Sequence, residues 1–414
     1  MKRVLPAAIF WNESHLWGIW LYKALRKLKI KVELLSVEEL ETLTPNNYSV
    51  FFIPGGWSSN KLKALDEESK KRIRNFIEGG GVYFGICGGA GLATEEGLGL
   101  VEVKKNKNRV PGYSGTFLAL IEKTHPLFKG IKQPIFYLFY PPDFEIKDKS
   151  IKVLASFLKP GKDAFSSDLP VVDFEGFWEE VEAFYEIALN PERMKYKPLF
   201  MESELGKGKI YLSLIHVDTP RDKNGAKILE NLSFLHSISK VSNKENLSRV
   251  ELKGLQKTFF INLQSFAQSL NNLILLAERN FLFYKRYPFL YQWRRGIRGL
   301  EYLNLWVIFK ELLELLPKVK LSEDLLKVLW EKFLEIFSKL QYFLESSSFL
   351  LIKERLRLNK EKLTYKDTQD EELRNLRKEL FGESKSYGGL YKEILDTMDY
   401  IFLKILKEYN NLTS

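Results

Sequence analysis

One segment of the chain has the pattern of a cysteine nucleophile. An apolar run, residues 82–86, leads into the sequence GICGG, whose Cys87 is the only cysteine present. This is the glycine–x–nucleophile–x–glycine pattern of a nucleophile elbow, a turn from strand to helix too tight for side chains beside the nucleophile. The N-terminus of the following helix favours the thiolate. The pattern predicts attack of Cys87 on a carbonyl carbon; the alternative is a buried structural cysteine beside a glycine turn.

Four histidines are present, and His216 is the candidate base for Cys87. It ends a strand-like run, residues 209–216, and a histidine at the carboxyl end of a parallel strand points into the crevice where an elbow opens. Asp218, two residues later, can orient the imidazole and stabilise its positive charge. The other histidines lack an adjacent acid and are assigned to a cap region, a turn and packing: His15, His125 and His236.

An enzyme that forms a thioester also needs hydrogen-bond donors for the oxyanion. One candidate is the backbone N–H of Gly88, directly after the nucleophile. The other is the loop of residues 54–57, where Gly55 and Gly56 let the backbone approach a substrate. This chemistry requires no metal and no organic cofactor, and its substrate would be a small-molecule or peptide amide.

The first half of the chain alternates between strand and helix patterns. We expect strands at 4–10, 31–35, 48–53, 82–86, 116–121, 151–157, 199–204 and 210–216, and helices at 15–28, 66–78 and 177–188. Apolar strands that alternate with helices of ordinary length predict an α/β fold, in which helices cover both faces of a parallel sheet.

The composition changes near residue 240. Of 15 prolines only Pro288 and Pro317 lie beyond it, and long stretches without turn residues favour long helices. Helices are expected at 249–285, 289–316, 322–358 and 371–409, which predicts an all-α helical bundle. The polar segment 237–248 is the expected linker.

The glycine loop, the elbow and the His216–Asp218 segment resemble the class I glutamine amidotransferase-like superfamily in order and spacing. Within it the sequence is most similar to the amidotransferase-like domain at the N-terminus of biotin–protein ligases, through the IPGG loop, the YFGICGGA elbow and the GKG turn at 206–208. We therefore expect such a domain at residues 1–238 and a helical bundle domain at 249–414.

The resemblance implies a flavodoxin-like fold and a triad of Cys87, His216 and Asp218. Glutaminases of the superfamily usually carry His-x-Glu, whereas this chain has Asp218, and no synthase domain that would receive ammonia is recognisable. The expected function is thus a cysteine-dependent hydrolase or amidotransferase-like activity on an amide or ester bond. The alternative is a binding or scaffold protein that keeps the fold without turnover.

The charge distribution and composition of the sequence limit the kinds of partner that the protein is expected to bind. The net charge of +10 is spread over both halves, which argues against nucleic acid as the partner. A basic, aromatic stretch at 284–298 could bind nucleic acid or a membrane surface, but its pattern favours a packed helix with solvated charges. A single cysteine favours a cytoplasmic location, and no apolar run is long enough for a membrane span.

The helical half has no recognisable acceptor-substrate motif, and its polar residues are expected on helix surfaces. We therefore expect it to act by contact, either as a lid over the Cys87 crevice or by recruiting a protein partner. A lid would bury the apolar faces of residues 281–306, whereas a recruiting surface would leave an exposed apolar patch.

Overall fold

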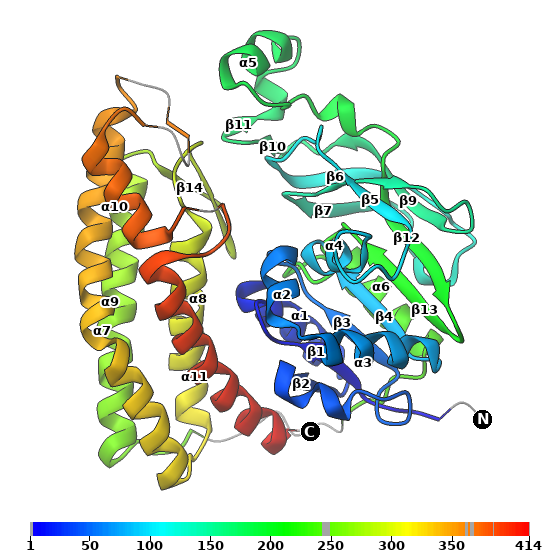
Figure 1. Ribbon diagram of the computed structural model, residues 1–414, viewed down its shortest axis with the longest axis horizontal. Coiled ribbons are helices and arrows are strands. Elements are labelled where there is room, and N and C mark those ends of the chain that lie inside the picture. Colours follow the sequence, from blue (N-terminus) through cyan, green and yellow to red (C-terminus); the bar gives the residue numbers. More distant parts are fainter. Residues whose placement is uncertain (1–2, 242–248, 361–362, 365–367, 384, 414) are drawn as a thin grey trace. The chain divides into compact units, whose positions relative to one another are not determined.

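The computed structural model describes residues 3–241, 249–360, 363–364, 368–383 and 385–413. The chain separates into two compact units, Met1–Asn243 and Lys244–Ser414 (Figure 1). The first unit is α/β, and the second consists mainly of long helices, as the fold class drawn from the sequence predicts.

Five parallel strands form the centre of the α/β unit. Their order across the sheet is β2-β1-β3-β4-β13, which is the strand order of flavodoxin-like folds. Their bounds are β1 Ala7–Phe10, β2 Val32–Leu35, β3 Val50–Ile53, β4 Val82–Ile86 and β13 Gly208–Ser213. Almost every residue in them is buried, as expected for strands covered on both faces.

Helices connect these strands. Helix α1, His15–Lys27, links β1 to β2, and α3, Glu67–Glu78, precedes β4. The side chain of Asp66 caps α3 by accepting a hydrogen bond from the backbone N–H of Ser69 at 2.7 Å. The two crossovers run in opposite directions across the sheet, so right-handed connections place α1 and α3 on opposite faces.

The rest of the sheet is antiparallel, so the sheet is mixed rather than parallel throughout. It continues from β13 through β12, β9, β6, β10 and β11, and β7 pairs with β6. The bounds are β6 Tyr113–Ile121, β7 Ile135–Phe139, β9 Lys152–Pro160, β10 Phe165–Ser166, β11 Leu169–Pro170 and β12 Pro198–Leu205. The extra strands come from the segment between β4 and β13. The strands expected at 116–121, 151–157 and 199–204 correspond to β6, β9 and β12, whereas β7, β10 and β11 were not expected.

Shorter elements complete the unit. They are α2 Ser58–Ala64, α4 Gly88–Ala93, the pair β5 Val103–Asn106 and β8 Asp143–Ile146, α5 Trp178–Tyr185, and α6 Lys223–Leu235. Four 3-10 helices lie at Val37–Thr42, Pro126–Phe128, Val171–Asp173 and Pro191–Met194. Strand β13 ends at Ser213, so His216 lies beyond the strand on which the sequence placed it.

Four helices of the second unit form a closed ring of neighbours. Helix α7 packs on α8 and α9, and α11 packs on the same two helices, with α10 against α9 and α11. Their bounds are α7 Gly254–Arg279, α8 Leu300–Leu315, α9 Glu323–Arg357, α10 Glu371–Phe381 and α11 Gly389–Thr413, with a 3-10 turn at Leu316–Lys318. Apolar side chains fill the space between the four helices. The aromatic ring centroids of Phe266 and Phe337, for example, lie 5.1 Å apart.

Three expected helices of this unit are wrong in their extent. The aromatic stretch expected as a packed helix at 284–298, which overlaps the expected helices 249–285 and 289–316, instead contains a β-hairpin of β14 Phe283–Tyr287 and β15 Leu290–Trp293. Its aromatic residues favour strands, and Pro288 lies in the turn. The expected helix 371–409 is broken between α10 and α11, where Gly382 and Gly389 adopt positive φ angles of 74° and 59°.

The polar residues of the helical unit are not confined to its surface, which corrects the expectation from the sequence. Arg377 pairs with Glu354 at 2.7 Å, and Arg298 pairs with Glu301 at 2.9 Å, all four side chains being buried. Asn304 donates to the hydroxyl of Tyr387 at 2.6 Å. The apolar periodicity of the sequence hid these residues because each is a single polar position inside an apolar stripe.

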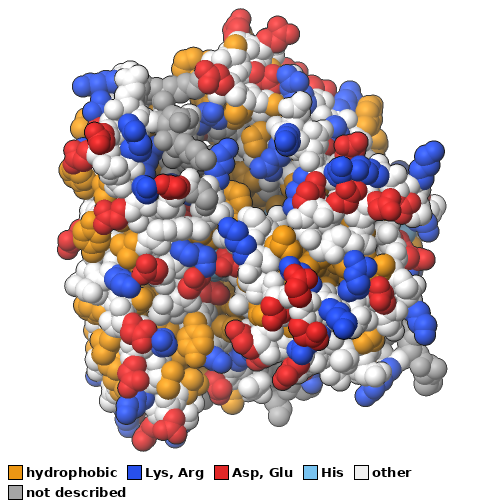
Figure 2. Space-filling model, viewed as in Figure 1, with side chains coloured by type: hydrophobic (Ala, Val, Ile, Leu, Met, Phe, Trp, Pro, Cys, Tyr) orange, Lys and Arg blue, Asp and Glu red, His pale blue; other side chains and the backbone are white. Residues whose placement is uncertain are grey.

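The expected linker also begins later than predicted. Ile238 bridges to Leu5 and Lys240 bridges to Ile30, so these residues belong to the α/β unit; residues 242–248 lie outside the described part of the chain. None of the described helices is long and apolar enough to span a membrane. On the face shown in Figure 2, Lys and Arg side chains are interspersed with Asp and Glu, so the net positive charge does not gather in one patch there.

Candidate functional site

Cys87 lies in a tight turn between β4 and α4. Its φ and ψ angles of 48° and −103° are unusual for a residue with a side chain, and such strain is typical of functional positions. A Cβ on Gly88 would lie 1.8 Å from the carbonyl oxygen of Gly56, and one on Gly89 would lie 2.0 Å from that of Ile53. The glycines of the GICGG segment are therefore required by close backbone contacts, as an elbow demands.

The elbow lies beside the end of β13. The backbone N–H of Cys87 donates to the carbonyl oxygen of Ser213 at 2.7 Å, and the N–H of His216 donates to that of Tyr137 at 3.0 Å. These bonds fix the segment after β13 between β4 and β7. The cysteine is partly exposed, and its Sγ lies 3.7 Å from the carbonyl oxygen of Phe139.

His216 and Asp218 form a buried pair. Nδ1 of His216 lies 3.1 Å from Oδ1 of Asp218, and neither side chain is exposed to solvent. Nε2 of His216 and Oδ2 of Asp218 are buried without a hydrogen-bond partner among the described residues. Buried polar atoms are nearly always paired, so the unpaired Nε2 is a feature that calls for a functional explanation.

The electrostatics of the site connect this pair to Cys87. Burial is the largest influence and lowers the pKa of His216, but the charge and hydrogen bond of Asp218, together with the Cys87 side chain, raise it to about 9. The thiol is thus near enough to influence the imidazole. At neutral pH the imidazole is protonated beside Asp218.

Aromatic rings enclose the imidazole. The ring centroid of Trp17 lies 4.6 Å from that of His216, and the centroid of Phe139 lies 5.3 Å away. Both rings are buried, so they exclude water from the base. Sequence analysis missed Phe139 because β7 gave no clear signal, and it gave no basis for placing Trp17 against the histidine.

The glycine loop after β3 meets both the histidine and the elbow. A Cβ on Gly55 would lie 3.0 Å from Cγ of Trp17 and 3.2 Å from Cε1 of His216, so any larger residue would have to displace these rings. Gly56 has a φ of 106°, and its carbonyl oxygen lies against Gly88. The structure therefore brings the predicted residues of the site together: Cys87, His216, Asp218, Gly55, Gly56 and Gly88.

A buried lysine holds the loop before α1 next to this glycine loop. Nζ of Lys61 donates to the carbonyl oxygen of Glu13 at 2.9 Å and to Oγ of Ser14 at 2.7 Å. A Cβ on Gly56 would lie 2.7 Å from the carbonyl oxygen of Glu13. Lys61 thus positions the backbone around Gly56. The sequence analysis did not identify it because lysine side chains usually face solvent.

A second carboxylate lies near Asp218. Burial raises the pKa of Asp222 to about 6; backbone hydrogen bonds from Gly225 and Asn224 oppose this, and the charge of Asp218 adds to it. Its Oδ1 caps α6 by accepting from the N–H of Asn224 at 2.9 Å. Asp222 makes no hydrogen bond to His216 among the described contacts, so it is a neighbour of the pair rather than a member.

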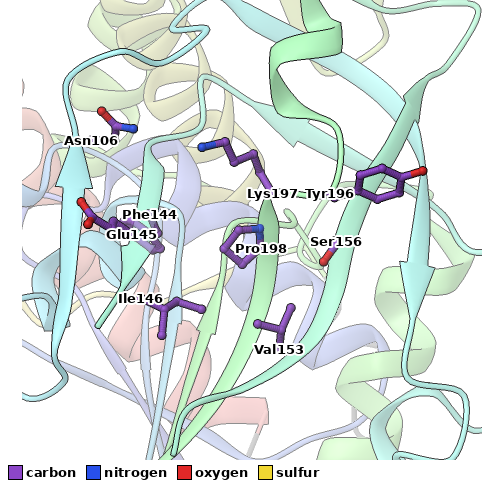
Figure 3. Close-up of a pocket in the computed structure, with 9 residues that line it drawn as sticks. All are labelled: Asn106, Phe144, Glu145, Ile146, Val153, Ser156, Tyr196, Lys197 and Pro198. Atoms are coloured by element: carbon purple, nitrogen blue, oxygen red, sulfur yellow. The ribbon is translucent and has the colours of Figure 1, made fainter. Parts of the chain in front are cut away.

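A separate hollow of about 600 Å³ lies on the same unit, between β5, β8, β9 and β12 (Figure 3). It is lined by Asn106, Phe144, Glu145, Ile146, Val153, Ser156, Tyr196, Lys197 and Pro198. None of the residues around Cys87 lines it, so the chemistry indicated by the elbow does not belong to this hollow. In the described part of the chain, no group of three His, Cys, Asp or Glu residues is arranged to hold a metal ion.

Residues 23–110 match the protein family described as "Biotin-protein ligase, N terminal". The match confirms the family resemblance drawn from the sequence. It includes the Gly55–Gly56 loop and Cys87, and it ends before His216 and Asp218.

Solved structures with a similar fold were also found. A PurLQS structure from Thermotoga maritima is 14% identical, with a TM-score of 0.41 over 57% of this chain and 100% of that one. A protein described as a GMP synthase subunit from Thermoplasma acidophilum is 12% identical, with a TM-score of 0.39 over 57% and 96%. A β-galactosidase from Bacillus circulans is 12% identical, with a TM-score of 0.38 over 59% and 33%. Curated protein sequences give no match.

Proposed function

We propose that residues 1–238 form a cysteine-dependent hydrolase or amidotransferase-like domain that acts on an amide or ester bond. The observation that carries the proposal is the buried His216–Asp218 pair next to the Cys87 elbow, with Cys87 among the groups that raise the pKa of His216 to about 9. An activated thiol with an oriented base is the arrangement needed for nucleophilic attack on a carbonyl.

The reaction would proceed through a thioester. In the reacting pair the thiol proton resides on His216, Asp218 stabilises the resulting imidazolium, and the thiolate of Cys87 attacks the carbonyl carbon. The imidazolium then gives its proton to the leaving amine or alcohol, and the acyl group stays on sulfur. Water attacks the thioester with His216 as base, which releases the acid and restores the thiol.

The backbone around Gly56 and Gly88 is our candidate for oxyanion stabilisation. Backbone N–H groups suit this role because they are fixed before the reaction and need no reorganisation. The close approach of Gly55 to His216 supports a substrate position between the glycine loop and the elbow. Substitution of Gly88 by alanine would force the two loops apart.

A trapping experiment tests the proposal. The full chain is incubated with a panel of primary amides and activated esters. The reaction is then quenched in acid, and the intact mass of the protein is measured by mass spectrometry. We expect a mass increase equal to one acyl group on Cys87 and none in the Cys87→Ala variant. Absence of any adduct, with release of ammonia or alcohol no faster than in buffer, would contradict the proposal.

A non-catalytic binding or scaffold role is the second candidate, and one observation favours it. The side chain of His216 has no exposure to solvent, although a general base must exchange protons with the substrate. The rate of alkylation of Cys87 at neutral pH separates the candidates. An enzyme requires a rate well above that of an exposed reference thiol, whereas a scaffold predicts an equal or lower rate.

For the domain at residues 249–414 we propose a role by contact. Three apolar side chains on α9 at helical spacing support partner recruitment, since Tyr342, Phe349 and Leu356 are 45%, 48% and 60% exposed. Deletion of residues 241–414 tests this role. Recruitment predicts a stable, reactive fragment, whereas a lid predicts aggregation or loss of Cys87 reactivity.

A further inference from the structure

A second hollow lies on the helical unit, between α9 and α10, which pack against each other (Figure 1). We call it the α9–α10 hollow, and its volume is about 460 Å³. The residues that line it recur at intervals of three or four along both helices, so each wall is one face of a helix. The charged and apolar side chains of the walls are Tyr342, Glu345 and Phe349 of α9 and Glu372, Leu376 and Glu379 of α10.

The α9–α10 hollow is acidic, although the chain as a whole is basic. Three of the lining side chains are carboxylates, and none of the described residues that line the hollow is a lysine or an arginine. The whole chain carries a net charge of +10. Carboxylates on facing walls repel one another, and a bound cation would relieve that repulsion. The charge of the hollow therefore favours a cationic occupant over an anionic one.

Glu345 is the carboxylate of the hollow that has no partner among the described residues. Glu379 accepts a hydrogen bond from the hydroxyl of Tyr342 at 2.7 Å, and Glu372 pairs with Lys353. Glu345 lies three residues after Tyr342 on an exposed face of α9. Its carboxylate is thus available to a bound group, and its substitution breaks no contact within the described part of the chain.

Lys353 shows how this surface binds a cation. Its Nζ contacts the carboxylate of Glu372 and lies 5.3 Å from the ring centroid of Phe349. A carboxylate and the face of an aromatic ring are both favourable neighbours for an ammonium group. Lys353 follows Phe349 by one helical turn, and Glu345 precedes it by one turn. Glu345 and Phe349 therefore offer a further ammonium the same two kinds of group.

We propose that the α9–α10 hollow binds a lysine-rich segment of a protein partner, with an ammonium group at Glu345 and its aliphatic stem against Phe349 and Leu376. A lysine suits these walls because its stem packs on apolar surface while its charge stays at the rim. The inference rests on the recruiting role proposed for residues 249–414, and it adds the chemistry of the partner.

Other kinds of occupant fit the hollow less well. A purely apolar partner would remove water from three carboxylates without supplying a compensating charge, which is unfavourable. A metal ion is disfavoured as well, because no three His, Cys, Asp or Glu residues in the described ranges are arranged to hold one.

Fluorescence anisotropy with two labelled peptides tests the proposal on the full chain. The probes are hexalysine and the same peptide with every side chain acetylated, which removes the charge. We expect hexalysine to bind roughly tenfold more tightly than the acetylated peptide, because the carboxylates of the hollow attract its ammonium groups. Added salt should weaken this binding, since exposed charges are screened. Equal affinities for the two peptides, or no binding of hexalysine, would overturn the proposal.

Variants of α9 locate the binding. Glu345→Lys should weaken hexalysine binding roughly tenfold, and Phe349→Ala should weaken it about threefold, because the first removes the attraction and the second the ring beneath the stem. The controls are Glu331→Lys and Leu334→Ala, two exposed positions of the same helix that do not line the hollow. The proposal requires both losses. Equal affinity in Glu345→Lys and Glu331→Lys, or in Phe349→Ala and Leu334→Ala, would overturn it.

The outcome is separable from that of the recruiting role. If recruitment is wrong, deletion of residues 241–414 causes aggregation or loss of Cys87 reactivity, whatever the affinity for hexalysine. If only the lysine-rich partner is wrong, the deletion leaves a stable, reactive fragment, while the full chain binds hexalysine no more tightly than the Glu345→Lys variant does.

Discussion

The two units each bury an acid–base pair, and the surroundings of the pairs differ. In the helical unit, Arg377 binds Glu354 and also donates to the carbonyl oxygens of Thr364 and Gly296 at 2.6 and 2.9 Å. In the α/β unit, His216 and Asp218 each leave one polar atom unpaired. A pair whose hydrogen bonds are complete fixes structure, whereas incomplete pairing beside a strained cysteine indicates chemistry.

The largest expected effect comes from breaking the Glu354–Arg377 pair, whose hydrogen bonds are complete. Glu354→Gln would leave Arg377 as an uncompensated buried charge, so we expect the free energy of unfolding of the helical unit to fall by about 3–5 kcal/mol. Urea denaturation followed by circular dichroism measures it. The matched control is Glu393→Gln, because Glu393 pairs with Lys339 at 2.7 Å in an exposed position and should cost less than about 1 kcal/mol. Equal losses of unfolding free energy in Glu354→Gln and Glu393→Gln would contradict the claim that the buried pair fixes the structure.

The His216–Asp218 pair, in which two polar atoms lack hydrogen bonds, should affect turnover rather than stability. Asp218→Asn keeps the shape of the side chain but removes the charge that stabilises the imidazolium, so turnover should fall roughly 100-fold or more while the fold persists. Asp222→Asn is the control, since Asp222 is buried nearby without a hydrogen bond to His216. Acyl-adduct formation on Cys87 measures both. A large loss of stability in Asp218→Asn, without loss of turnover, would make this pair structural as well.

The smallest expected effect concerns Asp222 and pH. Burial raises its pKa from 3.8 to about 6 in the folded chain, so its contribution to stability is fully present below pH 3.8 and is lost as the pH rises through 6. Asp222→Asn removes this dependence. Relative to the unmodified chain, the variant should therefore gain stability of roughly 2 kcal/mol between pH 4 and pH 8. A constant difference in stability over this range would show that the carboxyl titrates normally.

The sequence was informative where local geometry limits residue choice. The elbow requires its glycines because their Cα atoms touch the backbone of other loops, and that requirement is visible as GICGG. The strands around it were predicted within a few residues, because buried parallel strands are apolar throughout. The family match of residues 23–110 confirms the recognition of this region.

Contacts between distant segments were not predictable from the sequence. Trp17 and Phe139 enclose His216 only because α1, β7 and the end of β13 converge, and no local pattern records that convergence. The buried pair of Glu354 and Arg377 was missed for the same reason, since the two residues lie on different helices.

The central claim is that Cys87, His216 and Asp218 act as one electrostatic unit. Titration of the His216 ring by NMR tests it most directly, in the unmodified chain and in the Cys87→Ser and Asp218→Asn variants. We expect a pKa of about 9 in the unmodified chain, a lower value in Cys87→Ser and a still lower value in Asp218→Asn. A pKa near 6.5 that neither substitution changes would contradict the account.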